Sequence, residues 1–306
     1  MILCLSLNTA LDKTLVLDRL RPGDRHQPKV ALDLAGGKGV NAARALSGLG
    51  MKVRVLGFLA GHTGRHIAEI LAGECVPADW VFLPRGESRT CITLVHGSMK
   101  PTEVNEDGPR VPRACLRRLE AIYQRRLKGC RFVLLCGRLP PGVPADFYAR
   151  LIRLARAQGV PVALDASEPA LAPALAAGPD LVKPNEVEMQ ELGLPISPGR
   201  WKDALNRLAQ LGAGEAFATF GPLGALLKTE GKVLHAKAPS FKGCPLGCGD
   251  TFLAAAVFGR LQDWGPELRL AFATAAATAN VRTLGAGLFL KEHLRSILAQ
   301  VKVRPL

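Results

Sequence analysis

The chain has 306 residues, 48% of them hydrophobic, and its 40 Lys and Arg residues against 26 Asp and Glu residues give a formal net charge of +14. It contains no run of about 18 apolar residues, which argues against a transmembrane helix and a membrane partner. Aromatic residues make up only 5% and do not lie between the basic runs. A surface that stacks nucleic-acid bases is therefore not expected, and the positive charge favours a small anionic substrate.

The start of the chain and its cysteines indicate a cytoplasmic protein. An apolar run follows Met1 directly, without a basic segment or a small-residue cleavage site, so it predicts a strand rather than a signal peptide. The eight cysteines form no C-x-x-C pair, and reduced, mostly buried thiols are expected. Cys244 with Cys248, and His62 with His66, have spacings that suit half of a metal site, but neither pair has accompanying ligands.

Strand-like apolar runs alternate with helical patterns along most of the chain. The expected strands are 3–7, 53–59, 132–136, 160–164, 181–182, 216–220, 224–228 and 232–235. The expected helices are 40–49, 64–71, 112–127, 145–157, 204–211, 250–261 and 267–281. This alternation predicts an α/β fold with a mostly parallel sheet and helices on both faces. In such folds ligands bind at the carboxyl ends of the strands.

Four short extended runs do not follow the alternation. They are residues 13–17, 29–34, 89–95 and 102–105, and no helix separates the members of either pair. They predict a small second sheet whose uncovered face is solvated or packs on a ligand or another subunit. We interpret this sheet as a lid, inserted within residues 12–35 and 88–106 of a single domain that spans 1–306.

The most informative motif is Gly247-Cys248-Gly249-Asp250, which opens an alanine-rich helix. Its glycines allow backbone N–H groups to point at an anion from the positive end of the helix. Asp250 then stands beside that anion and can take a proton from an attacking hydroxyl. The motif suits transfer of a phosphoryl group to an alcohol.

A second glycine-rich turn, Gly36-Gly37-Lys38-Gly39-Val40-Asn41, precedes the first helix. Paired glycines allow close approach of the backbone to a ligand, although such a turn alone is equally a structural feature. It is neither a Walker A loop nor the dinucleotide-binding G-x-G-x-x-G motif.

Two further motifs follow strands. Asp12 lies after the first strand and can hold sugar hydroxyls, with a simple turn as the alternative. In Lys183-Pro184-Asn185-Glu186-Val187-Glu188, Asn185 and Glu188 lie one helical turn apart. Glu188 can orient water around Mg²⁺ and Asn185 can cap the helix, or both residues serve as a cap alone.

Together these motifs resemble those of the ribokinase-like, or PfkB, family of sugar kinases. The matching segments are Asn8-x-x-x-Asp12, Gly36-Gly37-Lys38-Gly39-x-Asn41, Lys183-Pro184-Asn185-x-x-Glu188 and Gly247-x-Gly249-Asp250. The resemblance covers essentially the whole chain. It implies a ribokinase-like three-layer sandwich with a β-sheet lid. Residues 139–144, 89–90 and 102–106 resemble the subgroup of 1-phosphofructokinases and tagatose-6-phosphate kinases, which use Mg·ATP on a ketohexose that is already phosphorylated.

The resemblance implies roles at the acceptor side of the site. Asp250 is the general base, and the anion hole for the transferred group is formed by the backbone N–H groups of Gly247, Cys248 and Gly249. Residues that hold the sugar are Asp12, Gly37 and Asn41. Candidates for the phosphate already on the sugar are Lys38 and Arg89. Arg138 stands at a departure from the family pattern, where it either adds a contact to this phosphate or points to solvent.

It also implies roles at the nucleotide side. The residues that face ATP are Lys183, Asn185, Thr219, Gly221 and Asn280, and Glu188 supports Mg²⁺ indirectly. Three segments depart from the family pattern. Cys248 replaces the usual Ala, Cys136-Gly137-Arg138 stands where Ser-Gly-Ser is common, and Phe220-Gly221-Pro222 alters a usual Leu-Gly turn.

From these motifs we expect an ATP- and Mg²⁺-dependent kinase that converts fructose 1-phosphate to fructose 1,6-bisphosphate and forms a homodimer through its lid. The alternatives are a tagatose-6-phosphate kinase, a kinase for a neutral sugar or nucleoside, and a non-catalytic sugar-phosphate sensor or nucleic-acid binder on the same fold. The intact Asp250 and its flanking glycines argue against lost catalysis.

Overall fold

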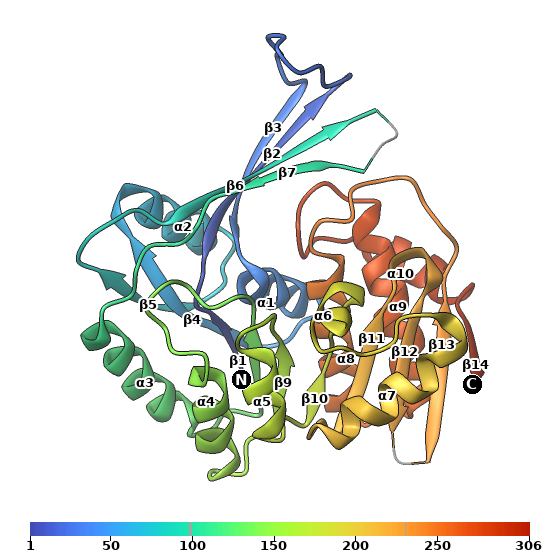
Figure 1. The fold of residues 1–306 in the computed structure, drawn as a ribbon. Helices are drawn as coiled ribbons and strands as arrows, with labels where there is room; N and C mark the ends of the chain where they lie inside the picture. Colours follow the sequence, from blue (N-terminus) through green and yellow to red (C-terminus); the bar gives the residue numbers. More distant parts are fainter. Residues whose placement is uncertain (98–99, 230) are drawn as a thin grey trace.

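A computed structural model describes residues 1–97, 100–229 and 231–306, which form one large sheet and one small sheet (Figure 1). The large sheet has ten strands in the order β14-β13-β12-β11-β10-β9-β8-β1-β4-β5. Its strands are β1 (Ile2–Ser6), β4 (Val53–Ala60), β5 (Ala78–Leu83), β8 (Phe132–Cys136), β9 (Val162–Asp165), β10 (Leu181–Val182), β11 (Glu215–Thr219), β12 (Ala225–Thr229), β13 (Lys232–Lys237) and β14 (Lys302–Pro305). The run from β5 to β11 is parallel, and β12, β13 and β14 add antiparallel pairs at one side.

Helices cover both faces of the large sheet, which gives three layers. Within β1, Ile2 and Cys4 belong to the core of one face and Leu3 and Leu5 to the core of the other, because successive side chains of a strand point in opposite directions. The first core is completed by α1 (Lys38–Gly48), α2 (Gly61–Gly73), α8 (Cys248–Leu261), α9 (Pro266–Val281) and α10 (Lys291–Leu298). The second is completed by α3 (Arg113–Leu127), α4 (Phe147–Arg156), α5 (Leu171–Ala176), α6 (Glu186–Glu191) and α7 (Trp201–Gln210). The predicted α/β sandwich is confirmed.

The small sheet projects from the main body (Figure 1). Its order is β3-β2-β6-β7, from β2 (Ala10–Leu17), β3 (Val30–Gly36), β6 (Arg89–His96) and β7 (Thr102–Asn105). β2 pairs in parallel with β6, so the two separate segments of the chain are joined at the centre of the sheet. All four predicted runs form strands, and the prediction of a small separate sheet is confirmed.

Four elements were not predicted from the sequence: β5, β14, α5 and α10. β5 and β14 lie at the two edges of the large sheet, and the charged residues and proline of β14 obscure its strand pattern, whereas β5 is mostly apolar. α5 is short and contains Pro173, and α10 has only 8 residues. Two 3₁₀ turns, η1 (Pro198–Arg200) and η2 (Gly221–Leu223), flank α7 and β12. Among the described residues no helix combines the length and apolar character required to cross a bilayer.

Candidate active site

The predicted motifs meet at the carboxyl edge of the parallel strands. β8 leads into Gly137, β9 ends at Asp165, and β10 is followed by Lys183. The adjacent β11 ends at Thr219, which forms an isolated parallel bridge with Asn185. Because parallel strands point the same way, segments that are far apart in the sequence deliver polar groups to one edge.

Two lysines and two carboxylates form an ionic cluster at this edge. Lys38 Nζ lies 2.7 Å from Asp165 Oδ1 and 2.9 Å from Glu188 Oε1, and Lys183 Nζ lies 2.9 Å from Asp165 Oδ2. Burial alone would lower the pKa of Lys38, but the carboxylates of Asp165, Glu188 and Asp250 raise it well above its usual value. Burial alone would raise the pKa of Asp165, and the two lysines outweigh it and lower that pKa. Lys38 and Asp165 are therefore charged near neutral pH.

Asp250 lies at the start of α8, beside this cluster. It is buried, and Asn41 Nδ2 donates a hydrogen bond to its Oδ2 at 2.8 Å. Burial and the charge of Asp165 raise the pKa of Asp250 from 3.8 to about 7, against the opposing effects of Lys38, Asn41 and Lys183. A carboxyl that titrates near pH 7 can both accept and release a proton under physiological conditions.

The turn before α8 has the geometry expected of an anion-binding helix terminus. Gly247 adopts a left-handed conformation (φ 74°), and a Cβ there would lie 2.5 Å from the Cβ of Ala286. No side chain caps the helix, although the N–H of Cys248 donates to the carbonyl of Pro245 at 3.2 Å. Burial raises the pKa of Cys248 to about 12, so its thiol stays neutral and adds no negative charge to the turn.

The glycine-rich turn before α1 closes on Asp12. A Cβ on Gly36 would overlap the Asp12 carboxylate, and Gly37 has φ 100° with its N–H bonded to that carboxylate. Burial raises the pKa of Asp12 to about 6, and the positive charges of Arg89 and Arg44 oppose the shift. Asp12 lies beside this turn, on strand β2 of the small sheet.

The two predicted phosphate-binding arginines differ in their surroundings. Arg89 begins β6, and its Nε donates to the carbonyl of Asn8 at 3.1 Å while its Nη1 lies 3.5 Å from the carbonyl of Glu106. Arg138 is exposed and follows Gly137, where a Cβ would lie 3.6 Å from the Cβ of Lys38. The segment of Arg138 therefore lies next to Lys38, whereas Arg89 lies beside Asn8 and Glu106.

At the nucleotide side, Asn185 and Glu188 form a reciprocal capping box at the start of α6. Asn185 Oδ1 accepts from the N–H of Glu188, and Glu188 Oε2 accepts from the N–H of Asn185, both at 2.9 Å. The capping alternative for these residues is thus present, and the other oxygen of Glu188 binds Lys38. Thr219 is half-buried, and the exposed Gly221 begins the turn η2.

Asn280 lies away from any exposed surface. Its side chain has 0% exposure, its Oδ1 accepts from the Thr251 hydroxyl at 2.7 Å, and its Nδ2 donates to the carbonyl of Gly285 at 3.0 Å. The prediction that Asn280 faces the nucleotide does not fit this environment. These contacts instead hold the 285–287 loop against the start of α8.

Two residues of this region were missed by the sequence interpretation. Asp165 is buried and binds both lysines, and Arg44 donates to Asn41 Oδ1 at 3.2 Å. A signal for Asp165 was present, because it is a charged residue directly after an apolar strand that ends at the functional edge. Arg44 has no such signal, since its pattern is that of a helix interior.

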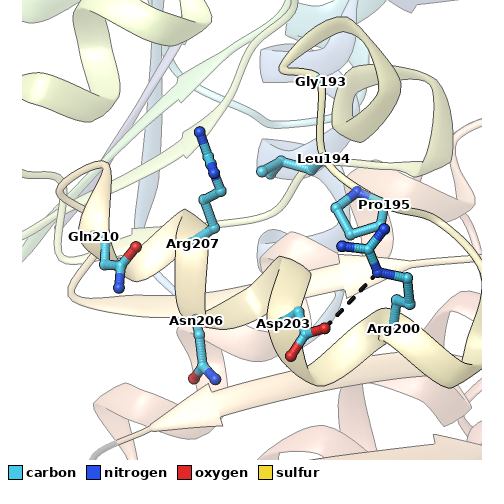
Figure 2. Close-up of a pocket in the computed structure, with 8 residues that line it drawn as sticks. All are labelled: Gly193, Leu194, Pro195, Arg200, Asp203, Asn206, Arg207 and Gln210. Atoms are coloured by element: carbon cyan, nitrogen blue, oxygen red, sulfur yellow. Dashed lines mark ion pairs between the residues drawn. The ribbon is translucent and has the colours of Figure 1, made fainter.

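A hollow on the surface lies away from this site. It has a volume of about 490 Å³ and is lined by Gly193, Leu194, Pro195, Arg200, Asp203, Asn206, Arg207 and Gln210. Figure 2 shows these side chains on the segment after α6, at the end of η1 and on α7, with Arg200 and Asp203 paired. None of the residues predicted for chemistry lines it.

A buried carboxyl with a raised pKa, an uncapped helix terminus and two buried or half-buried lysines define a site for transfer of a phosphoryl group. The comparison with known proteins agrees. The profile of the pfkB family of carbohydrate kinases matches residues 8–293. The chain therefore belongs to the pfkB family of carbohydrate kinases, which are phosphotransferases that use ATP as the phosphate donor.

Individual relatives match over nearly their whole length. The chain is 31% identical over 308 residues to the 1-phosphofructokinase of Vibrio cholerae, covering 100% of this chain and 97% of the relative. It is 28% identical over 318 residues to the tagatose-6-phosphate kinase of Staphylococcus epidermidis, covering 99% of each. A structure of Escherichia coli phosphofructokinase-2 in complex with substrates and products matches with a TM-score of 0.88 and 26% identity, covering 97% of this chain and 98% of that chain. Another structure of that E. coli protein is of its tetrameric inhibited form.

Proposed function

We propose that this protein transfers the γ-phosphoryl group of ATP to a phosphorylated ketohexose in the cytoplasm, and that fructose 1-phosphate is the acceptor. The observation that carries the reaction type is Asp250, a buried carboxyl with a pKa near 7 at the uncapped start of α8. The acceptor class is supported by full-length similarity to a 1-phosphofructokinase and a tagatose-6-phosphate kinase. In this proposal residues 1–306 are one kinase domain with the lid inserted.

The proposed chemistry assigns each group a task. Asp250 accepts the proton of the attacking sugar hydroxyl while Asn41 holds its carboxylate. The terminus of α8, with Gly247, Cys248 and Gly249, receives the transferred phosphoryl group through its N–H groups and the helix dipole. Positioning and charge neutralisation supply most of the rate enhancement of phosphoryl transfer.

In the same proposal the acceptor and the nucleotide bind on either side of the reacting group. The sugar is held by Asp12, Gly37 and Asn41, and its own phosphate by Lys38, Arg89 and Arg138. ATP lies along Lys183, Asn185, Thr219 and Gly221. The buried Asn280 supports the 285–287 loop rather than the base.

The acidic pair of the ionic cluster fits the metal that the family implies. Asp165 and Glu188 already place carboxylate oxygens around one cation, the ammonium group of Lys38. Mg²⁺ prefers oxygen ligands and usually combines one or two carboxylates with water and substrate phosphates. When bound, it would neutralise charge on the phosphates of ATP, with Glu188 acting through water and Asp165 beside it.

A coupled assay of ADP release tests the function. Fructose 1-phosphate, fructose 6-phosphate, tagatose 6-phosphate, ribose and adenosine are offered at equal concentrations with Mg·ATP. We expect the highest kcat/KM with fructose 1-phosphate. Preference for tagatose 6-phosphate, or for ribose or adenosine, would select one of the alternative kinases, and binding of sugar phosphates without ADP release would identify a sensor.

The pKa of Asp250 predicts the pH dependence of turnover. A general base works when it is deprotonated, so kcat should fall about tenfold for each pH unit below the pKa of about 7 and level off above it. The measurement is kcat at saturating substrates from pH 5.5 to 9. A profile that is flat between pH 5.5 and 8 would contradict the assignment of Asp250 as the base.

Arg89 is expected to recognise the charge of the acceptor. Arg89→Ala should weaken binding of phosphorylated sugars by about 1.5–3 kcal/mol, the scale of a hydrogen bond to a charged group. KM for ATP should change little. The matched control is Arg85→Ala, which removes an exposed arginine four residues earlier. An equal loss for a phosphorylated and a neutral sugar would refute the phosphate contact.

The lid is expected to pair two copies of the chain. Opposite residues of neighbouring strands share a face, so Val16, Val30 and Val95 lie on the same face of the lid as Asp12. Val30 is 44% exposed, and an exposed apolar sheet face favours association. We expect a homodimer in sedimentation at micromolar concentration, and Val30→Glu should weaken it. A fully active monomer would show that these faces have another use.

A further inference from the structure

Arg44 is a buried arginine one helical turn after Asn41 on α1, with 6% exposure. Its guanidinium is surrounded by acceptors. Nε and Nη2 donate to the two carboxylate oxygens of Glu74 at 2.7 and 2.8 Å. Nη2 also donates to the carbonyl of Ala35 at 2.6 Å, and Nη1 to the carbonyl of Ala286 at 2.9 Å and to Asn41 Oδ1 at 3.2 Å. The side chain is thus fixed in one orientation.

The contact with Asn41 determines which way its amide faces. A guanidinium carries only donors, so it binds the amide oxygen and leaves the amide nitrogen directed at Asp250, where Nδ2 donates to Oδ2 at 2.8 Å. Donation of an N–H favours the ionised carboxylate. A reversed amide would set two oxygens against each other and favour the protonated acid, which cannot act as a base.

The same guanidinium joins the two glycine turns of the site. The carbonyl of Ala35 directly precedes the Gly36-Gly37 turn. Ala286 packs on Gly247, where even a Cβ would be too close. One side chain therefore sets the position of the turn at α1 relative to the turn at α8.

We propose that Arg44 is a positioning residue for phosphoryl transfer, which keeps Asn41 oriented toward Asp250 and the two glycine turns in register. The inference rests on the proposed function, in which Asp250 is the base. It adds a residue that contacts neither the proposed substrates nor the reacting atoms.

Arg44→Lys is the main test because it keeps the positive charge near Asp12 and removes the planar set of donors. The apparent pKa below which kcat falls should rise by about 0.5–1 pH unit, the effect of about one hydrogen bond. Near pH 7 this lowers kcat by about two- to fivefold, and kcat should recover by pH 9. KM for ATP should be unchanged. The other groups that face Asp250 are unaltered: Asp165, Lys38, Lys183 and the neutral thiols of Cys136 and Cys248.

Arg269→Lys is the matched control. Arg269 is equally buried at 6% exposure, and its guanidinium binds both oxygens of Glu215 at 2.6 and 2.7 Å, away from the glycine turns. This variant should lose stability without a shift of the pH profile. Glu74→Gln weakens the ion pair that holds the Arg44 guanidinium, and it should shift the pH profile of kcat in the same direction by a smaller amount. This variant serves as the test if Arg44→Lys does not fold.

The pKa of Asp250 can also be followed without turnover, by ¹³C NMR of protein labelled at the aspartate carboxyl carbon, with Asp250→Asn to assign the resonance. A higher pKa in Arg44→Lys or Glu74→Gln supports the inference even if none of the offered sugars is phosphorylated. Folded Arg44→Lys or Glu74→Gln with the wild-type pKa, or an equal shift in Arg269→Lys, would overturn it. Failure of the proposed function would instead appear as an inactive wild-type protein.

Discussion

Replacing Asp250 by Asn is expected to lower kcat by about 10²–10⁴-fold, the usual contribution of a positioned acid–base group. The amide has nearly the same shape, and its oxygen can accept the hydrogen bond that Asn41 donates to Asp250 Oδ2 at 2.8 Å. The anion hole and the nucleotide contacts are unaffected, so binding of ATP should be retained. The control is Asp146→Asn, the same change at an exposed position. Near-normal turnover of Asp250→Asn would rule out the general-base role.

The same variant should be more stable than the wild type above neutral pH. The pKa of Asp250 is raised on folding from 3.8 to about 7, so the folded protein binds the extra proton and its stability falls as pH rises between these values. Above pH 7 the buried charge costs on the order of 1–4 kcal/mol, and an amide removes this cost. Urea unfolding at pH 5 and pH 8 measures it. Equal stabilities at pH 8 would mean that the carboxylate is better solvated than its burial indicates.

Removing Asp165 is expected to have the largest effect on stability. Asp165→Ala leaves Lys183, which is 1% exposed, without its ion-pair partner, and loss of one member of a buried pair costs about 3–5 kcal/mol. The matched control is Asp203→Ala on α7. Its pair with Arg200 spans 3.8 Å with both side chains about two-thirds exposed, so the change should be below about 0.5 kcal/mol.

A double-mutant cycle identifies the cause of the loss. Asp165→Leu with Lys183→Met replaces both charges by apolar groups, and should be less destabilised than the sum of the two single changes. Lys38 then retains Glu188 at 2.9 Å as its partner. Additive losses in urea unfolding would show that packing, rather than the unpaired charge, determines the cost.

Local patterns in the sequence predicted the glycine turns, the parallel strands and the small second sheet. Gly247 and Asp250 could be identified because their geometry depends on adjacent residues and on the helix that follows. The short strand β10 was also predicted, since an apolar pair precedes the Lys183 motif. The edge strand β14 was not, because its Lys302, Arg304 and Pro305 resemble a loop. The edge strand β5 was missed although its sequence is mostly apolar.

The interactions between distant segments could not be predicted. Lys38 and Asp165 are 127 positions apart, and Arg44 and the carbonyl of Ala286 are 242 apart, so only the fold reveals that they meet. The orientation of Asn280 is a similar case. When apolar residues surround a polar residue in a helix, the sequence does not indicate which way the polar side chain points. In the structure the Asn280 amide forms hydrogen bonds with the 285–287 loop.

The division of the proposed site between two bodies has a consequence for how acceptor choice could be altered. Asp12 and Arg89 belong to β2 and β6 of the lid, whereas Asp250 and Lys183 belong to the main body. In the proposed site, part of acceptor recognition is then encoded by the strands of the small sheet, whereas Lys38 and Asn41 contribute to it from α1 of the main body. Transplanting residues 10–36 and 89–105 from a relative of different preference would change the acceptor contacts proposed for Asp12 and Arg89, while Asp250 and Lys183 stay unchanged. The strands of the small sheet thus form a unit that can be exchanged without altering the residues proposed for phosphoryl transfer in the main body.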